Sequence, residues 1–362
     1  MSYTRKDFIH TLSFSLAGAL LQQRAPLWAK DKSIIGSESA FCKKLVPIGR
    51  ALELPDYYVW CNSPIIAPDG KTHVFFSRWK KSLGMSGWIN GSEIAHAVAE
   101  ALDQPFEVLQ TVLAPRGAGY WDATTCHNPL IKKIDDKYYL FYMGNANGKT
   151  NTKRIGLAIA DSIFGPWKRS DAPILLPGAE GAWDDHCTTN PAWVKGEDGN
   201  SWLYYKSWNT KDYETAKGAI RGNRKYGLAF ADQPEGPYKK YEHNPVIDFS
   251  SKGANRQFED AFVWREGGTY KMIARDMGVF NHDVGLIMES QDGVHWSEPQ
   301  IAYQALSYYV HEPPAPAHLK RYGRLERPML LLDDNSKPTW LFGASQGGKY
   351  ETSSAFIFKC EY

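Results

Sequence analysis

An internal repeat is the feature of this chain that most constrains its fold. One phrase occurs five times: a polar residue, a proline and an apolar run, followed by a short turn and an aromatic strand. The third copy, Thr189-Asn190-Pro191-Ala192-Trp193 before Trp202-Leu203-Tyr204-Tyr205, shows the pattern. The proline position falls at 64, 129, 191, 261 (an alanine) and 328, so the copies are 65, 62, 70 and 67 residues apart. Spacing of this kind indicates one structural unit repeated along the chain.

Each copy predicts four strands. The first two are joined by a turn of Asp, Asn and Gly residues, as at Asp69-Gly70 and Asp198-Gly199. A third strand follows in the phrase Gly-Leu-Ala (Gly156 to Ala158, Gly227 to Ala229), and a Gly-Pro-aromatic turn leads to a fourth. Four strands at this period are typical of a propeller blade. We therefore predict an all-β fold, a five-bladed β-propeller with four antiparallel strands per blade, over residues 55–362. A non-propeller stack of sheets is the alternative.

The N-terminus has the pattern of an export signal. Arg5 and Lys6 precede an apolar stretch over residues 8–21, and small residues follow near 25–29. The apolar stretch is too short to predict a stable membrane span. The basic pair resembles a twin-arginine signal with Lys6 in the second arginine position. We predict an export segment over residues 1–30, an extension over 31–54 and a periplasmic or extracellular protein. An amphipathic N-terminal helix is the alternative.

Composition narrows the class of function. The chain has 42 Lys and Arg against 40 Asp and Glu, a formal charge of +2, which argues against a dedicated nucleic-acid binder. None of the five cysteines forms a CxxC pair, so the sequence predicts no zinc site. A divalent cation in the propeller centre is compatible with the sequence, but no ligand cluster demands one. The aromatic content of 14% fits both β-strands and stacking on sugars.

The predicted propeller places the functional site. The first strand of each blade lines the axis, so residues at the starts of these strands converge on one funnel. One such column is Ser63, Asn128, Asn190, Asp260 and Arg327, and the column before it is Asn62, His127, Thr189, Glu259 and Glu326. These side chains could hydrogen-bond to one another and close the axis. Three carboxylates beside an arginine are, however, too charged for a plug alone.

The sequence resembles a superfamily of carbohydrate-active enzymes. The five-blade pattern, the phrase Ala160-Asp161-Ser162-Ile163-Phe164-Gly165-Pro166-Trp167 and the acidic strand starts resemble glycoside hydrolase families 43 and 32 over residues 55–360. His318 and Glu326, eight residues apart, resemble the active-site neighbourhood of family 117, where an Asp on the preceding blade would match Asp260. Members of that family act on anhydrogalactose ends of agar oligosaccharides. The resemblance implies an exo-acting glycosidase for plant or algal oligosaccharides, and the N-terminal pattern predicts that it is exported.

One departure from the superfamily affects the catalytic prediction. Its members usually carry an Asp-Pro phrase on the first or second blade, whose Asp is the base or nucleophile, whereas Ser63 and Asn128 stand there in this chain. Two Trp-Asp phrases offer substitutes: Asp122 follows Trp121, and Asp184 and Asp185 follow Trp183. The alternative is that these acids are loop anchors that cap backbone N–H groups.

Glycoside hydrolysis needs a proton donor and a second carboxylate. We predict that Glu326 is the acid, that Asp260 orients it, that Asp122 or Asp185 is the base, and that His318 assists proton transfer unless it is a plain loop residue. Basic residues after the second strands favour an oligosaccharide that carries a carboxylate or sulfate, although solvated surface residues would look the same. The predicted substrate-binding residues are His127, Asn128, Asn190, Glu259, Arg327, Arg78, Arg275, Lys206 and Trp208.

Two other functions fit the same residues. The missing Asp-Pro carboxylate favours a non-catalytic carbohydrate-binding propeller. A polysaccharide lyase for uronic acids would use His or Tyr as base and Arg to neutralise the acid. The sequence does not identify the sugar, the linkage, the stereochemistry or the oligomeric state.

Overall fold

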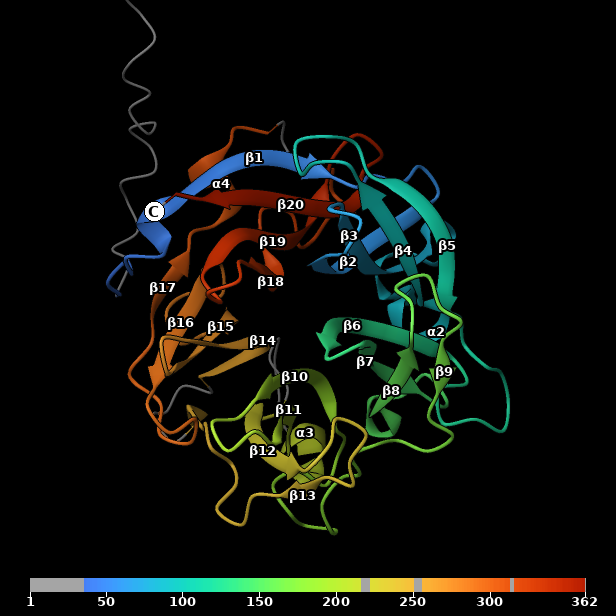
Figure 1. The fold of residues 1–362 in the computed structure, drawn as a ribbon, viewed down its shortest axis with the longest axis vertical. Coiled ribbons are helices and arrows are strands. Elements are labelled where there is room, and N and C mark those ends of the chain that lie inside the picture. The colour runs from blue at the N-terminus through green and yellow to red at the C-terminus, as the bar shows by residue number, and fades with distance from the viewer. Residues whose placement is uncertain (1–35, 216–221, 251–255, 313–315, 362) are drawn as a thin grey trace, which may run out of the picture. The chain divides into compact units, whose positions relative to one another are not determined.

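Five four-stranded antiparallel sheets surround a central axis (Figure 1). The computed structural model describes residues 36–215, 222–250, 256–312 and 316–361. The predicted five-bladed propeller with four strands per blade is confirmed. The predicted export segment lies outside the described residues. In the described part of the chain, no helix has the length and apolar character needed to cross a membrane.

The strands follow the predicted repeat. The first sheet is β2 (Tyr57–Ile66), β3 (Thr72–Lys80), β4 (Glu93–Ala99) and β5 (Glu107–Leu113), and the second is β6 (Thr125–Ile134), β7 (Lys137–Asn145), β8 (Arg154–Ala160) and β9 (Lys168–Arg169). The third is β10 (Thr189–Lys195), β11 (Ser201–Ser207), β12 (Lys225–Ala231) and β13 (Lys239–Lys240). The fourth is β14 (Gln257–Glu266), β15 (Thr269–Met277), β16 (Gly285–Ser290) and β17 (Gln300–Tyr303). The fifth contains β18 (Glu326–Leu332), β19 (Pro338–Gly347), β20 (Thr352–Cys360) and β1 (Leu45–Ala51).

Short helices interrupt the loops between the strands. Among the described residues, the α-helices are α2 (Trp88–Gly91), α3 (Thr210–Thr215) and α4 (Leu306–Tyr309). The 3-10 helices are η2 (Cys42–Lys44), η3 (Lys81–Leu83), η4 (Met85–Gly87) and η5 (Thr150–Thr152).

Aromatic pairs in the second strands fill the space between blades. Phe75-Phe76 in β3, Phe141-Tyr142 in β7 and Tyr204-Tyr205 in β11 are all fully buried. Because successive residues of a strand face opposite sides of the sheet, each pair offers one ring to each neighbouring blade. Much of the aromatic content is therefore core packing.

Every first strand contains a bulge at the same place. One residue in each has a left-handed backbone with φ between 53° and 65°, and the pairing with the second strand shifts there. These residues are Cys61, Asn128, Asn190, Asp260 and Arg327. The assignment of Ser63 and Asn62 to the two columns is therefore wrong, and Cys61 and Trp60 take those places. The error arises because Pro64 stands three residues after the left-handed residue, whereas Pro129 and Pro191 stand one residue after theirs.

The N-terminal strand closes the ring of blades. Strand β1 comes from the segment expected to precede the propeller, yet it pairs with β20 from Leu45↔Cys360 to Ala51↔Ala355. It forms the outer edge of the fifth sheet beside strands from the opposite end of the chain.

Removing β1 should destabilise the whole propeller. A chain that starts at residue 55 loses the buried Leu45 and Leu52 side chains and one row of hydrogen bonds. Burying each leucine is worth about 1.5–3 kcal/mol, so we expect the unfolding temperature to fall by roughly 10 °C. Circular dichroism melts would measure this against a chain that starts at residue 36. Equal melting temperatures would show that β1 contributes nothing to closure.

Candidate active site

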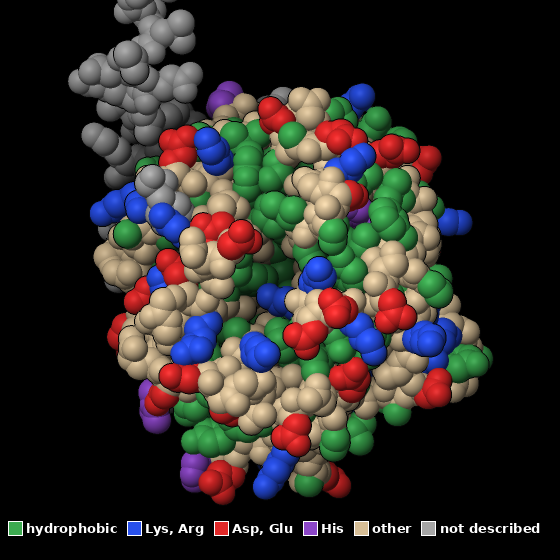
Figure 2. Space-filling model, viewed as in Figure 1, with side chains coloured by type: hydrophobic (Ala, Val, Ile, Leu, Met, Phe, Trp, Pro, Cys, Tyr) green, Lys and Arg blue, Asp and Glu red, His purple; other side chains and the backbone are tan. Residues whose placement is uncertain are grey.

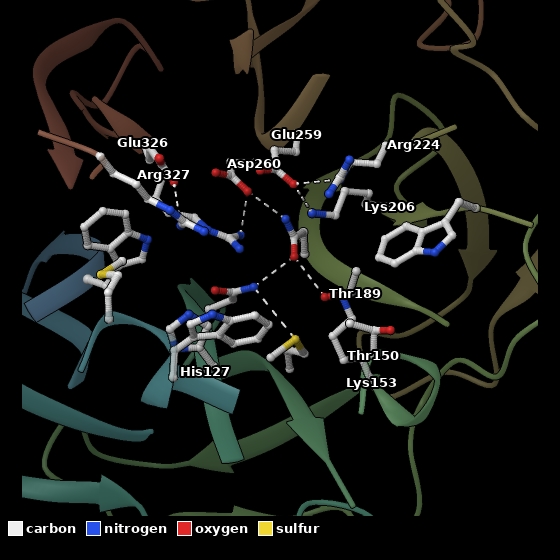
Figure 3. Close-up of a pocket in the computed structure, with 18 of the residues that line it drawn as sticks. His127, Thr150, Lys153, Thr189, Lys206, Arg224, Glu259, Asp260, Glu326 and Arg327 are labelled. Carbon is white, nitrogen blue, oxygen red and sulfur yellow. Dashed lines mark hydrogen bonds and ion pairs between the residues drawn. The ribbon is translucent and has the colours of Figure 1, made fainter. Parts of the chain in front are cut away.

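A pocket opens at one end of the axis, where the first strands begin. Its cavity has a volume of about 150 Å³. Figure 2 shows this face hollowed near its centre, with Lys and Arg side chains around the opening. In Figure 3 the labelled side chains surround this common space. First strands contribute these lining residues: Trp60, His127, Asn128, Thr189, Asn190, Glu259, Asp260, Glu326 and Arg327.

The left-handed residues form a polar chain across the axis. The Cys61 thiol donates to Asn128 Oδ1 at 3.0 Å, and Asn128 Nδ2 donates to Asn190 Oδ1 at 2.9 Å. Asn190 Nδ2 donates to Asp260 Oδ1 at 2.8 Å, and Arg327 Nη1 lies 3.0 Å from the same oxygen. Burial raises the pKa of Asp260, and the Arg327 charge opposes that rise. These contacts support the alternative in which this column closes the axis.

Glu259 is an ionised carboxylate held by cations. Its oxygens lie 2.6 Å from Lys206 Nζ, 3.2 Å from Arg224 Nε and 3.0 Å from Arg275 Nη1. Burial alone would raise the pKa of this carboxyl, but Lys206, Arg224, Arg275 and Arg327 together lower it well below its ordinary value. Arg275, predicted to bind substrate, contacts two carboxylates of the pocket but does not itself line the cavity.

Glu326 has one bound oxygen and one unbound oxygen. Its Oε2 lies 2.9 Å from Arg275 Nη1 and 3.5 Å from Arg321 Nη1. Its Oε1 is buried and has no hydrogen-bond partner among the described residues. A buried acceptor without a partner costs about 1–3 kcal/mol, which a ligand hydroxyl that donates to this atom would recover.

An aromatic wall faces these charges. Trp60, Trp79 and Trp88 line the pocket, and the Trp88 ring stacks on His127 with centroids 5.4 Å apart. The His127 Nδ1 atom hydrogen-bonds with Ser92 Oγ at 2.8 Å. Burial, with the Arg327 and Lys153 charges, lowers the pKa of His127 well below its ordinary value. His127 is therefore a neutral imidazole in the pocket.

Sequence reasoning missed three cations of the pocket: Lys153, Arg224 and Arg321. The repeat contained a signal for two of them. Lys153 and Arg224 each stand three residues before the glycine of the Gly-Leu-Ala phrase, so they hold the same place in consecutive blades. Trp208 and Lys206, which the sequence predicts to bind substrate, both line the pocket.

The two Trp-Asp phrases anchor loops and do not enter the pocket. Asp122 is buried against Arg116 at 2.5 Å and Arg169 at 3.3 Å, and it accepts the Tyr142 hydroxyl at 2.9 Å. In the next blade, Asp184 accepts the Tyr205 hydroxyl in the same way. These geometries favour the loop-anchor alternative.

Asp185 has a capping role in its loop. It accepts the backbone N–H groups of Gly181 at 2.8 Å and Thr210 at 2.6 Å. The expectation that Asp122 or Asp185 supplies a base on the funnel side is therefore corrected. Among the described residues, the carboxylates that line the pocket belong to Glu259, Asp260 and Glu326.

Two other predicted residues also lie elsewhere. His318 is exposed, with its Nε2 atom 3.3 Å from the Glu351 carbonyl, so it is a loop residue. Arg78 pairs with Glu93 at 2.8 Å and lies outside the pocket. Ser77, not Arg78, pairs with Trp60, the residue of β2 that lines the pocket. Because neighbouring residues of a strand face opposite sides of the sheet, Arg78 faces the side opposite to that of Ser77. Within the described ranges, no group of three or more His, Cys, Asp or Glu residues could hold a metal ion.

Comparison with known proteins agrees with this architecture. A family 117 glycoside hydrolase produced by the marine bacterium Zobellia galactanivorans is 19% identical, with a TM-score of 0.63 over 88% of this chain and 89% of that one. The GH43_1 enzyme from Xanthomonas citri, solved with xylotriose, is 16% identical, with a TM-score of 0.57 over 86% and 90%. These likenesses show the fold.

Sequence comparison identifies the family. No curated protein matches this chain. The family model described as the glycosyl hydrolases family 32 N-terminal domain matches residues 127–349, which is more than half of the chain and includes the starts of three first strands, β10, β14 and β18. The chain therefore belongs to the family of the glycosyl hydrolases family 32 N-terminal domain.

Proposed function

We propose that the protein is a glycosidase that removes the terminal sugar from plant or algal oligosaccharides. The observation that carries this proposal is the pairing, within one buried pocket, of Glu326, whose Oε1 has no partner, with the ionised Glu259. Arg275 Nη1 contacts both carboxylates, at 3.0 Å from Glu259 and 2.9 Å from Glu326, so the two groups share one nitrogen. Hydrolysis of a glycosidic bond uses two carboxyl groups, one as the proton donor and one as the base or nucleophile.

The chemistry assigns one role to each group. Glu326, as the acid, donates a proton to the glycosidic oxygen as the bond from that oxygen to the anomeric carbon breaks. A water oxygen attacks the anomeric carbon, and the water proton passes to a carboxylate. Glu259 is the ionised group available for this step, and its charge also stabilises the positive charge that develops on the sugar. Asp260 is a positioning residue, because Asn190 and Arg327 hold it in the polar chain.

The size of the cavity supports action at a chain end. Its volume of about 150 Å³ is below the ~300–1,000 Å³ of pockets for larger ligands. The bulged strands and the polar chain from Cys61 to Arg327 close its inner end. Such a pocket holds one sugar ring and leaves the rest of the oligosaccharide outside. Export to the periplasm or beyond remains part of the proposal and rests on the N-terminal sequence pattern.

A panel of oligosaccharides tests the proposal directly. The protein would be incubated with agar, xylan and pectin oligosaccharides, and released sugars would be separated by anion-exchange chromatography. We expect one monosaccharide to appear from the start of the reaction, without intermediate fragments. A mixture of fragments would contradict exo-action. An absorbance rise from an unsaturated product would indicate a lyase.

A carbohydrate-binding protein without catalysis is the second candidate. One observation favours it: Glu259, Asp260 and Glu326 each have a cationic partner within 3.0 Å. Stable ion pairs suit a fixed binding surface as well as a catalytic one. Binding of an oligosaccharide without any turnover across the panel would support this candidate over the glycosidase.

A further inference from the structure

We propose that this pocket selects an acidic sugar and that Lys153 receives its anionic group. The proposal rests on the proposed function to the extent that the sugar ring enters the same pocket. The chemical class is a sugar bearing a carboxylate or a sulfate ester. Lys153 takes no part in the proton transfers described above, so it is assigned to specificity.

The charge balance of the pocket leaves one cation without a counterion. Five lining residues are cationic and three are acidic. Lys206 and Arg224 pair with Glu259, Arg327 pairs with Asp260, and Arg321 lies near Glu326. Within the described part of the chain, no carboxylate lies within 4.0 Å of the Lys153 ammonium. Its side chain is nevertheless buried, since the residue is only 5% exposed.

The surroundings of Lys153 form a cationic corner around one indole ring. Lys153 Nζ lies 4.4 Å from the centre of the Trp208 ring, and Arg224 and Lys206 lie 5.6 and 5.9 Å from it. Lys153 directly follows η5, and Thr150 at the start of that helix also lines the pocket (Figure 3). A sugar ring in the pocket can therefore direct an anionic substituent toward three positive charges.

Because Lys153 is buried without a counterion, its surroundings favour the binding of an anion. An unpaired charge in a buried site is costly, and the usual response is neutralisation. Burial, reinforced by Lys206 and Arg224, lowers the pKa of Lys153 to about 7, against opposing contributions from Cys187 and Glu259. A bound carboxylate or sulfate would supply the missing counterion and favour the charged amine. A neutral sugar offers nothing equivalent.

Binding measurements with simple sugars test the proposal. Isothermal titration calorimetry at pH 6 would compare D-galacturonate, D-glucuronate, D-galactose 6-sulfate and D-galactose. We expect at least one acidic sugar to bind at least tenfold more tightly than D-galactose. The uronates and the sulfate ester distinguish the two sources of negative charge. Equal affinities for acidic and neutral sugars, or no binding of any acidic sugar, would overturn the proposal.

Variants assign the effect to Lys153. Lys153→Met should lower affinity for the acidic sugar at least tenfold and leave affinity for D-galactose within twofold, whereas Lys153→Arg should retain the preference. Lys168→Met on β9, an exposed position, is the matched control and should change neither affinity. Because Lys153→Met removes an unpaired buried charge, its unfolding temperature should not fall. Equal weakening of both sugars would assign Lys153 a merely structural role and reject the proposal.

The pH dependence provides a further readout. Lys153 shares its surroundings with Lys206, Arg224, Glu259, the buried Cys187 thiol and His186, whose pKa is lowered to about 4 mainly by burial. Since the Lys153 pKa is lowered to about 7, the amine loses its charge as the pH rises through neutrality. Affinity for the acidic sugar should therefore fall between pH 6 and pH 8.5 in the wild-type protein, and this fall should be absent in Lys153→Met. An identical pH profile in both proteins would contradict the assignment.

Failure of this proposal and failure of the proposed function are distinguishable. Hydrolysis of neutral oligosaccharides with no preference for acidic ones would leave the glycosidase intact and reject the role of Lys153. Selective binding of acidic sugars without turnover would support Lys153 and reject the glycosidase.

Discussion

Glu326→Gln is expected to lower the rate of hydrolysis by roughly 10²- to 10⁴-fold, the usual contribution of a general acid. Glutamine keeps the size of the side chain and can still contact Arg275, but it cannot donate a proton to a glycosidic oxygen. Substrate binding should be affected much less than turnover. The measurement is kcat and KM on the oligosaccharide that the panel identifies as the best substrate.

A surface substitution controls for general effects of removing a carboxylate. Glu289→Gln lies on the exposed side of β16, where the side chain is 58% exposed, and should leave both constants unchanged. If Glu326→Gln retains kcat within threefold, Glu326 is not the acid. If it raises KM alone, the residue binds substrate without taking part in proton transfer.

Arg275→Met is expected to destabilise the folded protein by about 3–5 kcal/mol, the cost of removing one partner from a buried ion pair. Arg275 is buried and its Nη1 atom contacts both Glu259 and Glu326. Its loss removes one of the three cations that contact Glu259 and leaves Glu326 with only the more distant Arg321, at 3.5 Å. Urea unfolding followed by tryptophan fluorescence would measure the free energy of unfolding. The variant should also lose activity, because both carboxylates would shift.

The cost of Arg275→Met should shrink in acid. Arg275 helps to lower the pKa of Glu259, so the stability that this interaction provides is present above the unfolded pKa, about 4.3 for a glutamate. It is lost as the pH falls toward the lowered folded pKa. Arg265→Met, which breaks a surface pair with Glu197 at 3.3 Å, is the matched control and should cost at most about 1 kcal/mol. Equal costs for the two variants at pH 7 would contradict the buried-pair argument.

The sequence predicted the architecture well because the repeat recurs at every level. The strand pairs, the hairpin turns and the spacing of the copies all indicate the same repeating unit. The number of blades can therefore be predicted without knowledge of side-chain contacts. In four of the five blades, the sequence correctly predicts which residues of the first strand face the axis. In the first blade the proline was a misleading marker, because the left-handed position depends on the bulge at Cys61 and not on Pro64.

The residues that line the pocket are harder to predict, because the direction of each side chain depends on the pleat of its strand and on contacts within the loops. Arg78 is displaced by one residue from the inward-facing position, and Asp122 is retained by Arg116 and Arg169 in its own blade. Lys153 and Arg224 were overlooked because lysine and arginine near a turn are usually solvated. Their equivalent positions in two blades were the available signal, but only the structure shows that both are directed to the axis.

Closure by β1 has a consequence for how the chain folds. The pairing of Leu45 with Cys360 joins two strands that are far apart in the sequence, so the fifth sheet cannot be completed until both β1 and β20 have been synthesised. Contacts this distant in sequence slow the search for the native state. Until then, the partly built fifth sheet has an unpaired edge, which is a site where aggregation begins. Sequence changes in β1 should therefore affect the yield of correctly folded protein more than the rate of any later catalytic step.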